Sequence, residues 1–471
     1  MTLDDDRLLP AEAGSRAVAR ELYRGVRDLA LVCPHTHIDP GALAEDRAFA
    51  DPVSLFVTAD HYVLRILMAQ GVRPEQLGLT RAGDGGRTVS PRSVWRTFAQ
   101  HWHLFRGTPT RTWIDHQLVD VFAVNEPFGP GTADETYDQI THQLATPEFR
   151  PRALFERFGI TLLATTDAPH RSLAAHEKLH ADGWGERIVP TFRPDTVVDL
   201  DQPGWLEAVG ELGAVTDTDV GSFSKYLQAL RARRRDFIAL GARASDHGPR
   251  HPRFARTSPR DLDDLFGRRR RDEAVSAVEA DRFRAHMLME FAEMSRADGL
   301  VMQVHPGSTR NHDAPMFAAY GPDIGADIPH PVDFVEGLRD VLNEFGHDEN
   351  FTLVMFTLDE GALGRELAPL AAHYPALRLG APWWFLDSPD GMRRHRELVS
   401  ETAGFYNGAG FNDDARCFTS IPARHDLARR CDSAYLARLV TEHRLDIDEA
   451  HDVARLWAHD QTLEVYRPVQ R

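Results

Sequence analysis

The sequence predicts a (β/α)8 barrel, in which eight parallel strands form a closed ring and a helix follows each strand. Eight apolar runs bounded by turn residues recur along the 471 residues. Several of these runs are apolar at every position, as strands buried on both faces are. Segments with the apolar period of a helix lie between most of them, for example residues 281–297 and 331–346. Eight alternating units favour a closed barrel over an open doubly wound sheet.

The expected strands span, in chain order, residues 29–35, 160–167, 187–192, 236–243, 299–305, 351–358, 377–385 and 404–411. One gap is much longer than the others: residues 40–155, between the first two strands, carry helical patterns such as DHYVLRILMAQ. We expect a single barrel domain over residues 1–471, with residues 40–155 as a helical insertion subdomain over the barrel mouth. The basic stretch 248–271 is expected to be a solvated loop that leads into a helix.

Composition excludes several classes of partner. The chain carries 54 Lys and Arg against 71 Asp and Glu, a formal charge of −17, so a nucleic-acid backbone would be repelled. The start MTLDDDRLLPAEAG lacks the basic region and apolar run of an export signal, and no window approaches the roughly 20 apolar residues of a membrane span. Three cysteines, none in C-x-x-C spacing, fit reduced thiols. We expect a cytoplasmic protein that binds neither nucleic acid nor membrane.

Polar residues at the strand ends predict a metal site, because barrel enzymes carry their chemistry at the C-terminal ends of the strands. His35 and His37 end the first strand, and residues two apart on an extended segment point the same way. Asp414 follows the eighth strand, which neighbours the first in a closed barrel. Together they would hold one divalent ion with an open position for water or substrate, as catalytic sites do.

The expected cofactor is a single divalent metal ion. Zinc is the default for two imidazoles and a carboxylate, and Mn²⁺ or Fe²⁺ would also suit them. A two-metal hydrolase would need another histidine after the sixth strand, and FTLVMFTLDE offers none.

Ten segments in order resemble the uronate isomerase family of the amidohydrolase superfamily, over roughly residues 30–430. They are CPHTHIDP (33–40), ADHYVLRILMAQGV (59–72), VWRTFAQHW…GTPTRTW (94–113), TADETYDQITHQLATPEF (132–149), TTDAPHRSLAAH (165–176), VPTFRPD (189–195), GARASDHG (241–248), MQVHPGSTRN (302–311), PWWFLDSPDGM (382–392) and DARCFTS…RHDLARR (414–430). The resemblance implies interconversion of D-glucuronate with D-fructuronate, and of D-galacturonate with D-tagaturonate. The expected partner is a small anionic sugar acid, and we expect a homo-oligomer.

The resemblance also implies roles for individual residues. Carried over by position, the metal ligands are His35, His37 and Asp414, and the catalytic residues are Asp414, His61, Tyr62 and His305. The substrate-binding residues are Arg193, Arg310, Arg416, Trp383, Trp384, Asp246, His247 and Arg65.

Isomerisation through an enediol needs a base at carbon, a donor to the carbonyl oxygen and stabilisation of the oxyanion. We expect Asp414 to be the base, with a hydroxide on the metal as the second candidate. Tyr62 or His61 would shuttle protons to the sugar oxygens. Three arginines, Arg193, Arg310 and Arg416, are candidates to grip the C6 carboxylate, because a guanidinium fork binds a carboxylate with two hydrogen bonds.

Several of these residues have a structural alternative. His61 and Tyr62 begin an amphipathic helix and could pack there, and Arg65 could form a surface ion pair. Trp383 and Trp384 are adjacent, so one should face the barrel interior and the other the helices. His247 could serve only to fix the loop after the fourth strand, and Asp387 could cap the helix that starts in DSPDGM.

Three places depart from the family pattern: Pro306 beside His305, Asp359 in TLDEG, and Pro422 in TSIPARHD. These departures leave open an isomerase of a modified uronate or a related polyhydroxy acid. A mononuclear metal-dependent hydrolase is a second alternative, although HPGSTR lacks a Glu at the spacing that mononuclear deaminases use. A catalytically silent sugar-acid binder is the third.

Overall fold

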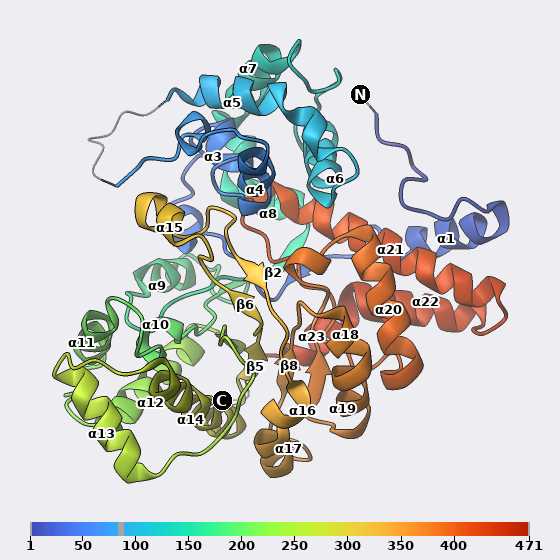
Figure 1. Ribbon diagram of the computed structural model, residues 1–471. Helices are drawn as coiled ribbons and strands as arrows, with labels where there is room; N and C mark the ends of the chain where they lie inside the picture. Colours follow the sequence, from blue (N-terminus) through green and yellow to red (C-terminus); the bar gives the residue numbers. More distant parts are fainter. Residues whose placement is uncertain (1, 83–88, 470–471) are drawn as a thin grey trace.

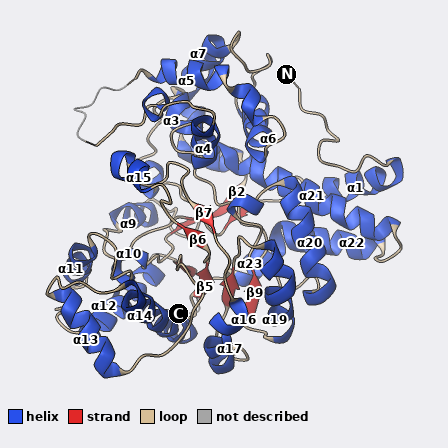
Figure 2. Ribbon diagram, in the orientation of Figure 1, coloured by secondary structure: helices blue, strands red, loops and turns tan. Residues whose placement is uncertain are grey.

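The computed structural model describes residues 2–82 and 89–469. Seven short parallel strands form two sheets, and helices surround them (Figure 2). The first sheet has the order β1 (Leu31–Cys33), β2 (Ile160–Ala164), β3 (Ile188–Val189). The second has the order β4 (Ala244–His247), β5 (Val301–Val304), β8 (Leu353–Met355), β9 (Leu377–Leu379).

Backbone bridges join the two sheets into a barrel-like ring in chain order. Phe192, after β3, bridges Ser245 of β4, and the Asp246 N–H donates to the Phe192 carbonyl at 2.9 Å. On the other side, Leu379 of β9 bridges Gly408. The His37 N–H donates to the Ala415 carbonyl at 2.9 Å, which brings the end of β1 beside the eighth segment. The arrangement is that of a TIM-like barrel in which the eighth position is irregular.

The predicted eighth strand, over residues 404–411, is not formed. Residues 404–411, all within the described part of the chain, form one β-bridge, from Gly408 to Leu379, and no longer run of strand hydrogen bonds. Gly404 and Gly410 have φ of +71° and +77°, left-handed conformations that an extended strand does not contain. The segment still returns the chain to β1, so it places Asp414 where a strand would.

The fourth expected strand is also wrong in its bounds. Residues 236–239 end helix α12 (Phe223–Ala239), because Phe237 continues its buried face. Gly241, with φ of +92°, then turns the chain, and β4 begins at Ala244. The residues expected to follow the strand, Asp246 and His247, therefore lie within it.

The long segment between β1 and β2 is helical. It contains α2 (Pro40–Ala44), α3 (Pro52–Phe56), α4 (His61–Ala69), α5 (Pro91–Gln100), α6 (Pro109–His116), α7 (Ala133–Leu144) and α8 (Pro151–Arg157). Most of these helices gather at the top of Figure 1. Their aromatic core, which includes Trp95 and Phe98, is continuous with Leu31 and Cys33 of β1. That residues 40–155 are a separate subdomain stays a prediction.

The remaining helices cover the outside of the strands. They are α9 (Ala174–Ala181), α10 (Asp195–Val198), α11 (Trp205–Val215), α12, α13 (Pro259–Arg270), α14 (Ala277–Asp298), α16 (Phe334–Gly337), α17 (Arg339–Phe345), α18 (Glu360–Ala362), α19 (Ala368–His373) and α20 (Pro389–Ala403). Helix α21 (Ile421–Thr441) packs against α1 (Ala13–Val26), α20 and α22 (Ile447–Arg455), and α23 (Gln461–Val465) ends the series. Within the described ranges, no helix has the length and apolar content needed to cross a membrane.

A loop after β5 carries its own small elements. Strands β6 (Ser308–Thr309) and β7 (Ile328–Pro329) pair antiparallel, and α15 (Ala314–Tyr320) lies between them. We call residues 310–327 the β6–β7 loop. Figure 1 shows it between the barrel strands and the helices of the β1–β2 segment.

Burial of a neutral histidine on α20 gives a prediction for stability. His395 is buried, and burial, with Arg396 nearby, lowers its pKa to about 3. In the unfolded chain this side chain binds a proton near pH 6.5, so its contribution is fully present above that pH and is lost as pH falls from 6.5 toward 3. In this window, His395→Leu should reduce the dependence of unfolding free energy on pH by up to about 1.4 kcal/mol per pH unit.

Urea unfolding of both proteins at pH 7, 6 and 5 measures this effect. The midpoint of the wild type should fall more steeply with decreasing pH than the midpoint of His395→Leu does. A difference between the two midpoints that stays constant across the three pH values would contradict the assignment of His395 as a buried neutral group.

Candidate active site

His35, His37 and Asp414 meet at one point. His35 Nε2 lies 3.4 Å and His37 Nε2 lies 3.2 Å from Asp414 Oδ1. Two atoms that each bind an ion at about 2.1 Å stand roughly 3–3.5 Å apart. Asp414 Oδ1 is buried and has no hydrogen-bond partner among the described residues. The donor set and its spacing therefore fit one divalent ion.

Hydrogen bonds hold Asp414 in an unusual backbone conformation. Its φ is +45°, in the left-handed region that costs a non-glycine residue about 1 kcal/mol or more. Its N–H donates to Asn412 Oδ1 at 3.0 Å, and the Ala415 N–H donates to Asp413 Oδ1 at 3.0 Å. Trp383 Nε1 donates to Asp414 Oδ2 at 3.2 Å. The two carboxylate oxygens thus face different partners.

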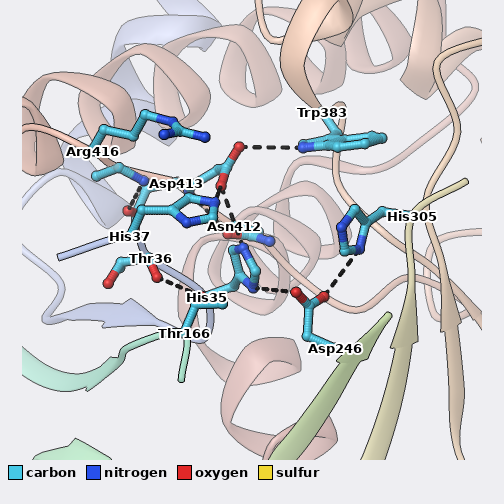
Figure 3. Close-up of polar contacts among 12 residues, drawn as sticks. His35, Thr36, His37, Thr166, Asp246, His305, Trp383, Asn412, Asp413 and Arg416 are labelled. Atoms are coloured by element: carbon cyan, nitrogen blue, oxygen red, sulfur yellow. Dashed lines mark hydrogen bonds and ion pairs between the residues drawn. The ribbon is translucent and has the colours of Figure 1, made fainter. Parts of the chain in front are cut away.

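Asp246 organises the opposite side of the site. Its carboxylate lies 3.1 Å from His305 Nδ1 and 3.8 Å from His35 Nδ1, as the dashed lines in Figure 3 show. Burial alone would raise the pKa of Asp246, but His305, His35 and Arg193 outweigh it and hold that pKa far below its usual value. Asp246 faces Nδ1 of His35, and Nε2 of the same ring faces Asp414. Carboxylates commonly orient metal-binding histidines in this way, by binding the ring nitrogen that does not bind the metal.

The two histidines after β1 have different acidities. Burial opposes the charged form of His35, yet Asp246 and Asp414 outweigh it and raise its pKa. For His37 burial prevails over Asp414 and lowers the pKa to about 4. Metal binding requires neutral imidazoles, so a proton competes with the ion more strongly at His35 than at His37.

A second group of possible metal donors lies behind the first. Cys33, Asp413 and His425 are buried with their donor atoms close together. His425 Nε2 lies 3.3 Å from Asp413 Oδ2, and Cys33 Sγ lies 3.7 Å from His425 Nε2. Since these groups satisfy one another and do not line the cavity described next, we interpret them as support for the segment that carries Asp414.

A cavity of about 260 Å³ opens beside the His35, His37 and Asp414 side chains. Small-molecule sites typically measure about 300–1,000 Å³, so the ligand should be small. The lining residues are His35, His37, His61, Arg193, Asp246, His305, Arg310, Asp323, Phe356, Trp383, Trp384, Asn412, Asp414 and Arg416. Most of the residues expected from sequence are therefore brought together.

Three expected residues do not line the cavity. Tyr62 stacks beneath His61, with ring centroids 4.5 Å apart. Arg65 lies over Phe385, with its guanidinium carbon 4.5 Å from the ring centroid. His247 pairs with Ser245 Oγ at 3.0 Å. Successive residues of β4 face opposite sides of the strand, so His247 points away from the cavity when Asp246 points into it.

Both adjacent tryptophans line the cavity, contrary to the expected alternation. The strand ends at Leu379, and Trp384 has a φ of +52° at the start of a short 3-10 helix, Trp384–Leu386. The period-two rule of a strand therefore does not apply to Trp383 and Trp384.

Sequence reasoning missed Asp323, Phe356 and Asn412 in the lining. Asn412 stands beside the Asp413-Asp414 pair, and this proximity could have suggested it. Asp323, in the β6–β7 loop, carried no such signal. Asp387 does not cap α20, because Ser388 Oγ accepts from the Gly391 N–H instead.

The three arginines of the cavity have different partners. Arg193 forms ion pairs with both Asp195, at 3.0 Å, and Asp246, at 3.4 Å. Arg310 pairs with Asp327 at 3.2 Å, and Arg416 pairs with Asp323 at 3.4 Å. Arg193 is therefore the most fully neutralised of the three.

Some donors and acceptors of the lining have no protein partner. Both ring nitrogens of His61 and the Nε1 atom of Trp384 are buried and make no hydrogen bond with the described residues. Buried polar groups normally find a partner, so these atoms are available to a ligand.

The family model described as glucuronate isomerase matches residues 3–457. The chain belongs to this family. It is 54% identical over 458 residues to a uronate isomerase of Rhizorhabdus wittichii, with 96% of both chains covered. It is 50% identical to a uronate isomerase of Mesorhizobium japonicum, covering 98% of this chain and 99% of that one.

Solved structures of the family have the same fold. The glucuronate isomerase of Caulobacter crescentus has a TM-score of 0.96 and 45% identity, covering 100% of this chain and 98% of that chain. The uronate isomerase of Thermotoga maritima has a TM-score of 0.91 and 29% identity, covering 99% and 100%. This likeness confirms the predicted barrel-like fold and the resemblance to the uronate isomerase family, and it favours an isomerase over the hydrolase and silent-binder alternatives.

Proposed function

We propose that the protein interconverts D-glucuronate with D-fructuronate, and D-galacturonate with D-tagaturonate. The observation that carries this proposal is the metal-type donor set of His35, His37 and Asp414 beside a cavity that also holds arginines and unpartnered polar atoms. The family to which the chain belongs is that of glucuronate isomerase. The cavity chemistry suits a sugar acid, which needs both cationic and hydrogen-bonding partners.

His35, His37 and Asp414 would hold the metal ion. When bound, a divalent ion supplies Lewis-acid stabilisation of negative charge on a sugar oxygen. We propose Zn²⁺, with Mn²⁺ or Fe²⁺ as alternatives, since all three suit two imidazoles and a carboxylate.

Asp414 would act as the base that moves the proton between C2 and C1. One of its oxygens faces the two histidines and the other accepts from Trp383 Nε1, which orients the carboxylate. Burial would raise the pKa of Asp414, but the neighbouring His35 and His37 side chains outweigh it and hold the pKa well below its usual value. A base of low pKa needs close positioning to be effective, and the fixed backbone around Asp414 supplies it.

His61 would contact the sugar oxygens. Burial and the nearby Arg416 lower the pKa of His61 well below its usual value, so the ring is neutral and offers one donor and one acceptor. Tyr62 lies behind His61 and would act through it. His305 is held by Asp246 at Nδ1 and by Arg193 Nη2 at Nε2, at 3.2 Å, and it would bind a second sugar hydroxyl from the β5 side when that hydroxyl takes the place of the Arg193 contact.

Arg310 and Arg416 are the better candidates to bind the C6 carboxylate. Two carboxylates already neutralise Arg193. Arg193 instead would fix Asp246, whose partners include both His35 and His305.

The departures from the family pattern do not favour a modified substrate. Asp359 caps α18, with its Oδ1 accepting from the Gly361 N–H at 2.8 Å. Pro422 stands in the first turn of α21. Neither of them lines the cavity, and nor does Pro306. We therefore propose the unmodified uronates as substrates. Separately, we propose that the protein is cytoplasmic and forms a homo-oligomer.

Assay of ketose formation from both uronates tests the function. Purified protein should form ketose from D-glucuronate or D-galacturonate, and prolonged chelation should reduce the rate by at least about a hundredfold, since metal charge stabilisation is worth several kcal/mol. Adding back Zn²⁺, Mn²⁺ or Fe²⁺ separately should restore it and identify the ion. The neutral aldoses D-glucose and D-galactose serve as controls. Metal-replete protein that forms no ketose from either uronate would refute the proposal.

A further inference from the structure

The β6–β7 loop supplies two carboxylates to the arginines of the cavity, and the two differ in how firmly they are held. Asp327 is 7% exposed and accepts from Arg310 Nη1 at 3.2 Å and from the Asn311 N–H at 2.6 Å. Asp323 has a side chain that is 53% exposed, and its contact with Arg416 Nη2 is 3.4 Å long. Asp327 is therefore a fixed part of the loop, and Asp323 is the exchangeable carboxylate.

The loop is docked so that Asp323 stays near Arg416. The Ala82 N–H donates to the Ala319 carbonyl at 2.8 Å, and the Tyr320 hydroxyl donates to Glu75. Gly325, with φ of +88°, lies so close to α4 that a Cβ atom there would come within 2.7 Å of Arg65 Cβ. The loop position is thus fixed by the backbone, while the Asp323 side chain is free to turn toward solvent.

We propose that Asp323 is a specificity-determining residue that pairs with Arg416 until the carboxylate of the substrate replaces it. This inference rests on the proposed function. Within the part of the chain that the structure describes, Asp323 is the carboxylate that forms an ion pair with Arg416.

Only an acid can replace Asp323 at Arg416. A uronate exchanges a long, half-exposed ion pair for one in which its own carboxylate can accept two hydrogen bonds from the guanidinium. A neutral aldose offers no such exchange, so it leaves Arg416 paired with Asp323. Asp323 therefore competes with the substrate carboxylate for Arg416, which lowers the affinity for acids and leaves the affinity for neutral sugars unchanged.

Calorimetric binding of two matched ligands to metal-loaded protein tests the proposal. L-gulonate is D-glucuronate with the aldehyde reduced, so it binds without reacting, and D-glucitol is the same chain with an alcohol in place of the carboxylate. Asp323→Asn should bind L-gulonate roughly two- to fivefold more tightly than the wild type does, the range expected for loss of one exposed ion pair. Affinity for D-glucitol should not change.

Asp313→Asn is the matched control. Asp313 lies in the same loop and caps α15, a role that asparagine fills equally well, and it does not line the cavity. It removes the same unit of charge and should leave both affinities at the wild-type value. The gain of Asp323→Asn should also shrink at 0.5 M salt, because salt screens exposed charges.

Two outcomes would overturn the inference. One is an unchanged or weakened affinity of Asp323→Asn for L-gulonate, and the other is an equal change for D-glucitol. If the wild type still isomerises uronates, the proposed function survives either result. Failure of the wild type to turn over any uronate would refute both the proposed function and the inference about Asp323.

Discussion

Asp414→Asn should lower kcat/KM for the uronates by at least about a thousandfold, because it removes both the base and a charged metal ligand. The fold should persist. Asparagine has nearly the same size, and it tolerates the φ of +45° at this position better than most residues do. The Trp383 Nε1 donor can still bond to the amide oxygen.

Steady-state ketose formation, metal content per chain and the thermal midpoint measure these effects together. The variant should lose most of its metal and its activity while the midpoint of the metal-free protein stays close to that of metal-free wild type. Asp313→Asn, which removes a charge outside the cavity, should behave as wild type. Activity within tenfold of wild type in Asp414→Asn would contradict the assignment of this residue as base and ligand.

Arg424→Leu should cost about 3–5 kcal/mol of unfolding free energy, the usual result of removing one partner of a buried ion pair. Arg424 Nη1 donates to Asp387 Oδ2 at 2.5 Å and to the Asp413 carbonyl at 3.1 Å. The side chains of Arg424 and Asp387 are each 5% exposed. Burial raises the pKa of Asp387 to about 7 even with Arg424 present, so loss of the guanidinium leaves a carboxyl with no compensating charge.

Urea unfolding of the metal-free protein measures this cost. The double variant Arg424→Leu, Asp387→Asn should recover part of it, since the uncompensated acid is gone. Arg393 and Asp390 form an exposed pair at 3.3 Å on the same helix, α20, and Arg393→Leu should change stability by less than about 1 kcal/mol. Equal effects of Arg424→Leu and Arg393→Leu would show that burial of the Arg424 pair is unimportant.

The contact between Arg424 and Asp413 links this buried pair to the active site. The Asp413 carbonyl is the acceptor, and the next residue is Asp414. Cys33 and His425 contact the side chain of Asp413 from the other side. The irregular eighth segment therefore depends on buried polar contacts, where a regular strand would depend on a ladder of backbone hydrogen bonds.

Sequence patterns alone predicted the class of fold and the three residues of the possible metal site, His35, His37 and Asp414. Apolar runs mark strands that are buried on both faces, and the i, i+2 spacing of His35 and His37 sets the direction of both rings wherever the backbone is extended. Periodicity was unreliable where apolar residues served a helix, as at Phe237, or where glycines broke the ladder, as at Gly404 and Gly410.

Long-range packing sets which polar side chains share the cavity. One residue of register in β4 turns Asp246 inward and His247 outward, and a left-handed φ at Trp384 brings two adjacent rings to one side. The partners of Arg193, Arg310 and Arg416 come from separate loops, and their distances and exposure depend on how those loops pack. Local sequence patterns carry no information about such long-range packing, so the role of Asp323 emerges only once the chain is folded.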